Sequence, residues 1–253
     1  MQPTRLPPSL WQFPDPTQAD PEGEGLVAVG ADLAPETILA AYHAGIFPWF
    51  NEDDPICWWS PEPRCIIIPH TFKPSKTLIR ALKKNRYTLT LDHSFSAVMR
   101  ACAGVRAYAE GTWINEEIIS GYCGLHAAGL AHSVEVWEQT EQGDATLVGG
   151  LYGVQIGQAF FGESMFSLRT DVSKMAFTFL MKLCMASNFP FVDCQLPNDH
   201  LMSLGATTQP RAQFLLQLKQ VLAESAPDWH LLQNRHFNCA ELLTPELFSG
   251  LIK

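Results

Sequence analysis

The sequence lacks the signals of several classes of protein. It has no run near the ~20 consecutive apolar residues that span a membrane, and its opening segment, MQPTRLPPSLWQFPDP, holds no apolar stretch of a secretory signal. Its seven cysteines are scattered with no CxxC pair, which argues against a disulfide framework or a zinc site. We therefore expect a protein of the reducing cytoplasm that uses no metal and contacts no membrane.

Basic residues are also scarce, with 17 Lys and Arg against 26 Asp and Glu and a net charge of −9. They are unevenly spread. Residues 1–60 hold one basic and nine acidic residues, whereas residues 64–106 hold nine basic residues and one acidic residue. Because fields between exposed charges decay over roughly 8 Å at physiological salt, a local basic surface can bind a polyanion even on an acidic protein.

One basic helix is predicted after Ser75, where KTLIRALKK places Lys76, Arg80 and Lys83 on one face. Such a stripe is usually a solvated helix face. Inside the basic segment, however, we favour contacts with the phosphates of an RNA backbone. The alternative RNA-binding residues are Arg100, Arg106 and Arg169.

The segment 147–206 predicts a strand, a helix and a returning strand. A glycine-rich strand over 147–161 leads through a tight segment into a helix, which Asp171 or Ser173 can cap. Ala176, Phe179, Leu180 and Leu183 fall on one face of that helix, and 189–195 forms the second strand. The helix N-terminus after the glycine-containing loop favours an anion.

The rest of the chain alternates strands with helices. This pattern predicts a mixed α/β fold, with a small N-terminal domain over 1–62 and a catalytic domain over 63–253. Further strands are predicted at 25–30 (buried), 65–68, 87–91, 132–137 and 145–154, the last two as an antiparallel hairpin. Further helices are predicted at 36–44, after Ser94 (short), after Asn115 as cap, and at 211–224; the tail beyond is uninformative.

Two polar residues stand out in the second strand of the central unit. Alternation puts Asp193 and Gln195 on the same face of this strand. An Asp-x-Gln pair usually marks a solvated edge, but the neighbours Phe191, Val192 and Cys194 argue for burial. A buried Asp costs free energy unless it is paired, so this pair is a candidate functional site.

Several ordered motifs resemble one family. FFGESMFS, DVSK, FVDCQLPNDH and SLGA, with GIFPWF, CWWSPEPR and EGTWI upstream, resemble the leucyl/phenylalanyl-tRNA–protein transferase family over roughly residues 25–211. The resemblance implies an N-acetyltransferase-like catalytic domain behind a small N-terminal domain. The Q/R-x-x-G-x-G/A loop of coenzyme-A users is missing ahead of Val172, so aminoacyl-tRNA is expected in place of acyl-coenzyme A.

The reaction that the resemblance implies moves Leu or Phe, and less often Met, from tRNA to the N-terminal amine of proteins that begin with Arg or Lys. This step marks them for N-end-rule degradation. Aminolysis of an ester needs no cofactor, metal or ATP. Because an α-amine has a pKa of about 7.7–8.0, its deprotonation at pH 7 costs about 1 kcal/mol, whereas orientation can contribute about 7–11 kcal/mol.

Within that frame we expect Gln195 to orient the incoming amine. Asp193 either fixes Gln195, relays the proton, or pairs with the cationic side chain of the acceptor. Glu163 is assigned to binding the amino group of the aminoacyl ester, and His200 is interpreted as structural. The residues expected to line the substrate site are Trp49, Trp113, Leu151, Phe160, Glu163, Ser164, Met165, Phe177 and Val192, although most are individually more typical of core.

Three other classes stay open from the sequence. An N-acetyltransferase that uses acetyl-coenzyme A would bind that cofactor. A tRNA-dependent cell-wall peptide ligase would prefer a wall precursor to an Arg-starting peptide. A non-catalytic RNA-binding module would not need Asp193 and Gln195 buried together.

Overall fold

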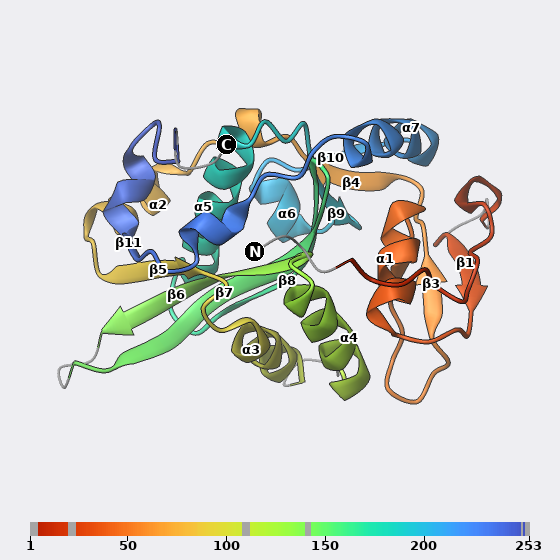
Figure 1. The fold of residues 1–253 in the computed structure, drawn as a ribbon. Coiled ribbons are helices and arrows are strands. Elements are labelled where there is room, and N and C mark those ends of the chain that lie inside the picture. The colour runs from red at the N-terminus through yellow and green to blue at the C-terminus, as the bar shows by residue number, and fades with distance from the viewer. Residues whose placement is uncertain (1–4, 20–23, 108–111, 140–142, 249, 251–253) are drawn as a thin grey trace.

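The computed structural model describes residues 5–19, 24–107, 112–139, 143–248 and 250. Most strands belong to one sheet with the order β10-β4-β9-β8-β7-β6-β5-β11 (Figure 1). Its strands are β4 (Arg64–Ile67), β5 (Tyr87–Leu91), β6 (Ala131–Gln139), β7 (Ala145–Ile156), β8 (Ala159–Ser167), β9 (Val192–Gln195), β10 (Thr207–Gln209) and β11 (Phe237–Asn238). All neighbours in it are antiparallel except β8 and β9.

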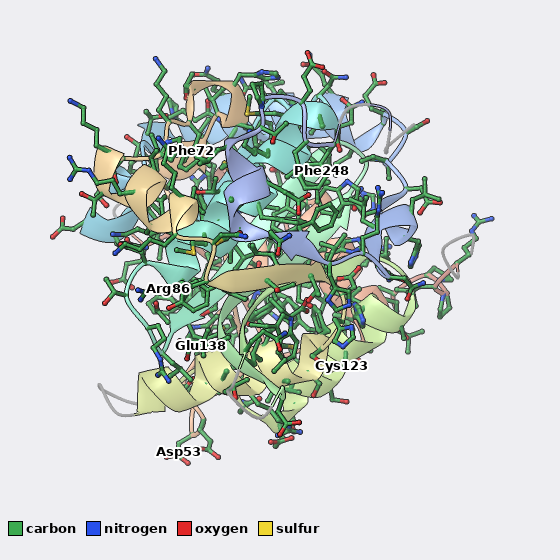
Figure 2. All side chains as sticks on the ribbon, turned by 90° about the vertical axis from the view of Figure 1, so that its left-hand side faces the viewer. Asp53, Phe72, Arg86, Cys123, Glu138 and Phe248 are labelled. Carbon is green, nitrogen blue, oxygen red and sulfur yellow. The ribbon has the colours of Figure 1, made fainter. Side chains whose placement is uncertain are left out.

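Helices cover both faces of this sheet. α5 (Val172–Ala186) lies on one face, while α3 (Phe95–Ala107) and α4 (Glu116–Ala127) lie on the other (Figure 1). Each face has its own apolar core. Figure 2 shows the two layers from the side, with Phe72 and Phe248 above β5 and Cys123 below it. The mixed α/β class predicted from the sequence is confirmed.

The strand–helix–strand unit is confirmed as β8, α5 and β9, because β8 and β9 pair in parallel. The predicted first strand over 147–161 is wrong, since a tight turn at Gly157 (φ +56°) divides it between β7 and β8. The capping prediction is also wrong. Asp171 stands at the N-cap position of α5, but its carboxylate accepts a hydrogen bond from Lys174 Nζ and caps no backbone N–H.

The first 60 residues form a separate small sheet with the order β1-β3-β2. Its elements are β1 (Leu26–Val29), α1 (Pro35–His43), β2 (Phe47–Pro48) and β3 (Cys57–Trp59). β1 is not the buried strand we predicted, because Val29 is 56% exposed. α1 packs on α4, and both contribute to the core below the large sheet. The boundary near residue 62 stays a prediction.

The remaining elements follow the sequence patterns closely, apart from the tail. Ser75 Oγ caps α2 (Lys76–Lys83), and Asn115 Oδ1 caps α4. α7 (Arg211–Leu222) has the predicted helical segment, and α3 is longer than expected. The tail, which the pattern left uninformative, contributes edge strand β11 and buries Trp229 in the upper core. The described elements also include α6 (Asp199–Ser203) and the 3₁₀ helices Pro16–Gln18, Pro69–Thr71, Trp229–Leu232 and Cys239–Leu243.

Candidate active site

A cavity of about 520 Å³ opens where β8 and β9 diverge. The two parallel strands pair only at Phe160 with Val192 and at Phe161 with Asp193. Beyond these pairs, Gly162 to Met165 of β8 and Cys194 to Gln195 of β9 line the cavity instead of pairing as neighbouring strands. The fold thus makes the cavity by opening a sheet, which is why the central segment of the sequence supplies so much of its wall.

Most residues predicted for the substrate site meet in this cavity, although their roles in binding stay predictions. The lining includes Trp49, Trp113, Leu151, Glu163, Ser164, Met165, Phe177, Val192 and Gln195. Residues that the sequence reasoning did not select also line it, including Phe47, Tyr152, Leu180, Cys194 and Leu201, and so does His200, which we had interpreted as structural.

The prediction that Phe160 lines the substrate site is wrong. Its side chain is 1% exposed and its ring lies 5.8 Å from that of Trp229 in the upper core. It does not line the cavity. The sequence could not exclude it, because the residue that covers Phe160 comes from the tail.

Asp193 was expected to fix Gln195, to relay the proton or to pair with the acceptor, and its contacts favour the first of these roles. Its carboxylate accepts two hydrogen bonds from the Arg64 guanidinium, at 2.8 Å from Nε and 2.6 Å from Nη2. Both side chains are 0% exposed. The Arg64 guanidinium lies between the rings of Phe47 and Phe214, at 5.1 and 4.5 Å from their centres. Asp193 is therefore already neutralised, and neither acceptor pairing nor proton relay fits its position.

The Asp193 carboxylate instead holds the backbone of the site. Its Oδ1 accepts a hydrogen bond from the N–H of Gln195 at 3.0 Å. Gln195 has φ +56°, a left-handed conformation that is uncommon for residues other than glycine. The backbone of β9 turns at this point, and the predicted shared face of the two side chains stays a prediction. Gln195 lines the cavity, while Asp193 is buried behind it.

Gln195 is connected to Glu163 across the gap between the strands. Its Nε2 donates to Glu163 Oε1 at 3.3 Å. Two phenols meet the same carboxyl, with Tyr42 Oη 2.6 Å from Oε1 and Tyr122 Oη 3.1 Å from Oε2. Burial raises the pKa of Glu163 to about 7, although the two phenols act in the opposite direction. The site therefore contains a carboxyl that changes charge near neutral pH.

Arg64, Tyr42 and Tyr122 are site residues that sequence reasoning missed. The sequence contains a signal for each. Arg64 directly precedes the strand predicted at 65–68 in PEPRCIII. Each tyrosine stands in an apolar helical segment, where a buried hydroxyl needs a hydrogen-bond partner. These patterns indicate buried polar groups but do not identify their partners.

The predicted RNA-binding residues lie apart from the cavity on α2. Lys76, Arg80 and Lys83 are exposed, and within the described part of the chain none of them makes an ion pair. The segment before α2 reaches the cavity, because the ring of Phe72 lies 5.5 Å from that of the cavity residue Phe177.

The alternative RNA-binding residues are less available. Arg100 pairs with Glu116 at 2.5 Å, and Arg169 pairs with Glu138 at 3.1 Å. The side chain of Arg106 lies outside the described residues. The structure thus favours α2 over these arginines as a surface for phosphates.

The described ranges hold neither a metal-binding cluster nor a membrane-spanning helix. No group of three or more His, Cys, Asp or Glu residues there is arranged to hold a metal ion. Over the same ranges, no helix has both the length and the apolarity needed to cross a bilayer.

A mainly apolar cavity with an amide and a carboxyl in its wall, in a protein whose helix α2 exposes several cations, suits an acyltransferase whose acyl group is carried on a polyanion. A family model described as leucyl/phenylalanyl-tRNA protein transferase matches residues 66–219, and one described as its N-terminal domain matches residues 31–62. The chain belongs to the leucyl/phenylalanyl-tRNA–protein transferase family and is an aminoacyltransferase.

Curated relatives with the name leucyl/phenylalanyl-tRNA–protein transferase are similar over most of their length. The protein of Psychrobacter cryohalolentis is 49% identical over 238 residues, which are 89% of this chain and 85% of the relative. That of Desulfatibacillum aliphaticivorans is 52% identical over 211 residues, 83% of this chain and 88% of the relative.

Solved structures show weaker likeness. FemX aligns with a TM-score of 0.46 at 11% identity over 72% of this chain and 70% of FemX. L-PGS from Bacillus licheniformis aligns with a TM-score of 0.37 at 13% identity over 62% and 56%.

Proposed function

We propose that this enzyme transfers Leu or Phe, and less often Met, from its tRNA to the N-terminal amine of proteins that begin with Arg or Lys, and so marks them for N-end-rule degradation in the cytoplasm. The observation that supports this most is the cavity between β8 and β9, which is lined mainly by apolar side chains and brings Gln195 and Glu163 together in its wall.

The apolar part of the cavity suits an unbranched-β side chain such as Leu or Phe. Leu151, Met165, Phe177, Leu180 and Val192 line it from four different elements. Met165 is flexible and can adapt to side chains of different shape. Because packing discriminates by only about 1–3 kcal/mol per methylene, some transfer of Met follows from the same pocket.

The polar end of the cavity suits an amine. With Nε2 of Gln195 turned to Glu163, the side-chain carbonyl of Gln195 is left to accept a hydrogen bond from the attacking amine. Glu163 serves as an amine-binding carboxyl beside it. Asp193 and Arg64 act behind this pair as positioning residues, because they hold the backbone N–H of Gln195.

The basic side chain of the acceptor needs a partner other than Asp193. Trp49 lines the cavity and is 43% exposed at its mouth, with its ring 6.0 Å from that of Trp59. An aromatic face attracts Arg or Lys through its quadrupole, by about 0.5–1 kcal/mol at exposed sites. Trp49 is therefore our candidate for reading the first acceptor residue.

Lys76, Arg80 and Lys83 of α2 bind the tRNA backbone in this proposal. Phosphate contacts release counterions, so affinity contributed by these cations falls as salt rises. Transfer from a short aminoacyl-adenosine, which has no acceptor stem, does not need them.

The test is to incubate the protein with labelled Leu-, Phe- or Ile-tRNA and a peptide that begins with Arg. We expect label from Leu and Phe but little from the β-branched Ile. A matched peptide that begins with Asp should accept little. If the Arg peptide gains no label while a cell-wall precursor does, or if acetyl-coenzyme A is the donor that is used, the proposed function is wrong.

A further inference from the structure

Three oxygen-bearing side chains from three elements meet at the polar end of the cavity. Tyr42 comes from α1, Tyr122 from α4 and Glu163 from β8. The two phenol oxygens lie 2.6 Å apart, and each is within hydrogen-bond distance of a different oxygen of the Glu163 carboxyl. Both tyrosines are 0% exposed, whereas Glu163 is partly exposed and lines the cavity.

The number of protons in this cluster decides how it is bonded. Each of the three contacts needs one proton between its two oxygens. With Glu163 ionised, the phenols supply only two protons for three contacts. With Glu163 protonated, three protons serve three contacts and the ring of donors and acceptors closes. The cluster can therefore hold Glu163 in both states, because the two phenols stabilise the carboxylate while burial favours the protonated carboxyl.

The charged groups around this cluster leave Glu163 as the group suited to receive that proton. Asp193 and Arg64 neutralise each other behind it, and Tyr152 lies beyond Tyr122 at a ring distance of 5.9 Å. Burial raises the pKa of the Cys194 thiol far above neutrality. Burial and Lys174 lower the pKa of His200, which makes it a weaker proton acceptor.

We infer that Glu163, held by Tyr42 and Tyr122, takes the proton from the N-terminal ammonium of the acceptor. The inference rests on the proposed function, since it concerns the amine that attacks the ester. It adds a catalytic residue, Glu163, and two positioning residues, Tyr42 and Tyr122, to the site.

The step balances without any further reactant. The ammonium gives one proton to the Glu163 carboxylate, and the neutral amine, held by Gln195, attacks the ester carbonyl. A C–N bond forms, the bond between the carbonyl carbon and the ribose oxygen breaks, and a proton from the amine nitrogen goes to that oxygen. Glu163 later releases its proton to water. A group with a pKa of about 7 is well matched to an α-amine near 7.7–8.0.

The experiment measures kcat/KM between pH 5.5 and 8.5 for the wild type and Glu163→Gln, with Phe-tRNA and an Arg-starting peptide. The amide keeps the shape of Glu163 but cannot take up the proton. We expect a loss of about 10²-fold at pH 7, and loss of the rise in kcat/KM near pH 7. Tyr42→Phe removes a donor that lowers the pKa of Glu163, so this rise should move to higher pH.

A second acceptor separates proton removal from binding. A peptide of the same sequence with an aminooxy group in place of its terminal amine is neutral over this pH range. With this acceptor no proton must be removed before attack. The fold loss of kcat/KM caused by Glu163→Gln should therefore be less than about one tenth of the fold loss measured with the ordinary peptide.

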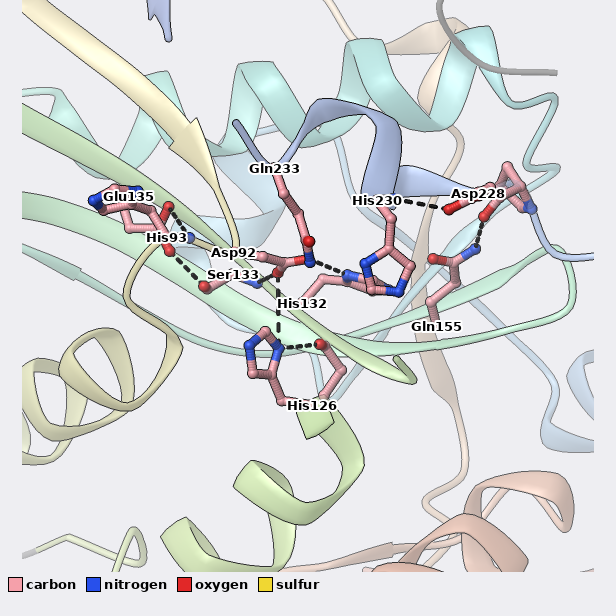
Figure 3. A network of polar contacts seen from close by, with 12 residues as sticks. Asp92, His93, His126, His132, Ser133, Glu135, Gln155, Asp228, His230 and Gln233 are labelled. Atoms are coloured by element: carbon pink, nitrogen blue, oxygen red, sulfur yellow. Dashed lines mark hydrogen bonds and ion pairs between the residues drawn. The ribbon is translucent and has the colours of Figure 1, made fainter. Parts of the chain in front are cut away.

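Glu135 provides a matched control. It is also buried, and burial raises its pKa to about 7, but it bonds to Thr90 and Ser133 in a separate network away from the cavity (Figure 3). Glu135→Gln should keep the pH profile of the wild type. Melting curves of each variant show whether it is folded.

The outcomes distinguish the two proposals. If the wild type transfers nothing, the proposed function fails. If the wild type transfers Phe but folded Glu163→Gln keeps both the rate and the rise near pH 7, or loses equally with both acceptors, Glu163 is not the proton acceptor.

Discussion

Glu163 of β8 and Glu135 of β6 both bond to groups on the face of the sheet that α3 and α4 cover, and they differ mainly in access. Burial raises the pKa of both to about 7. Glu135 accepts hydrogen bonds from Thr90, from Ser133 and from the backbone N–H of Ser94, and Asp92 beside it pairs with His132 at 2.7 Å (Figure 3). Glu163 has phenols on one side and the cavity on the other. A perturbed pKa thus marks burial in both places, and only the open cavity gives one of them a substrate to act on.

The largest effect should come from breaking the ion pair behind the site. Arg64→Ala leaves Asp193 as a buried, unpaired charge, which costs about 3–5 kcal/mol of the free energy of unfolding. Activity should fall too, because Gln195 loses its backbone anchor. Urea unfolding and kcat measure the two losses. Asp193→Asn, which can still accept from the N–H of Gln195, should retain more activity than Asp193→Ala, and equal losses would contradict the positioning role.

Removing the cations of α2 should produce the next largest effect. The triple variant of Lys76, Arg80 and Lys83 to Ala should flatten the log–log slope of tRNA affinity against salt by about 2–3 units. Filter binding at several salt concentrations measures this slope. The double variant Arg100→Ala, Arg169→Ala is the control, since both arginines are paired on the protein. If the slope falls only in the control variant, the RNA contacts lie at Arg100 and Arg169 and not on α2.

The two buried glutamates should make stability depend on pH. Their pKa values in the folded state exceed the ordinary value of 4.5, so the folded protein holds more protons between about pH 4.5 and 7. Their contribution to stability is complete below pH 4.5 and is lost as pH rises through about 7, on the order of 1–3 kcal/mol per group. Urea unfolding of Glu135→Gln and Glu163→Gln at pH 5 and 8 should each show a smaller difference than the wild type.

The smallest effect should be a change in donor preference. Val192→Phe narrows the cavity, so transfer of Phe should fall more than transfer of Leu, by a factor that corresponds to about 1–3 kcal/mol. The ratio of kcat/KM for the two charged tRNAs measures this preference. An unchanged ratio with unchanged rates would show that Val192 does not contact the transferred side chain.

The fold could be predicted from the sequence wherever local pattern decides the structure. α2 with its Ser75 cap and the β8–α5–β9 unit follow from capping residues and apolar spacing. The site could be predicted only in part. Glu163 and Gln195 stand in family motifs, but the partners that define them are distant, with Arg64 129 residues from Asp193 and Tyr42 121 residues from Glu163. The left-handed backbone of Gln195, which ends β9, also has no signal in the local pattern.

The long sequence separation between Tyr42 and Glu163 has a consequence for synthesis on the ribosome. At about 5–20 residues per second, the 121 residues that separate them take roughly 6–24 s to emerge. Until first α4 and then β8 have emerged, these elements do not cover the apolar side of α1, with Phe47 and Trp58 near it. The nascent N-terminal segment therefore exposes apolar surface for seconds, and we expect chaperones to bind it during that time.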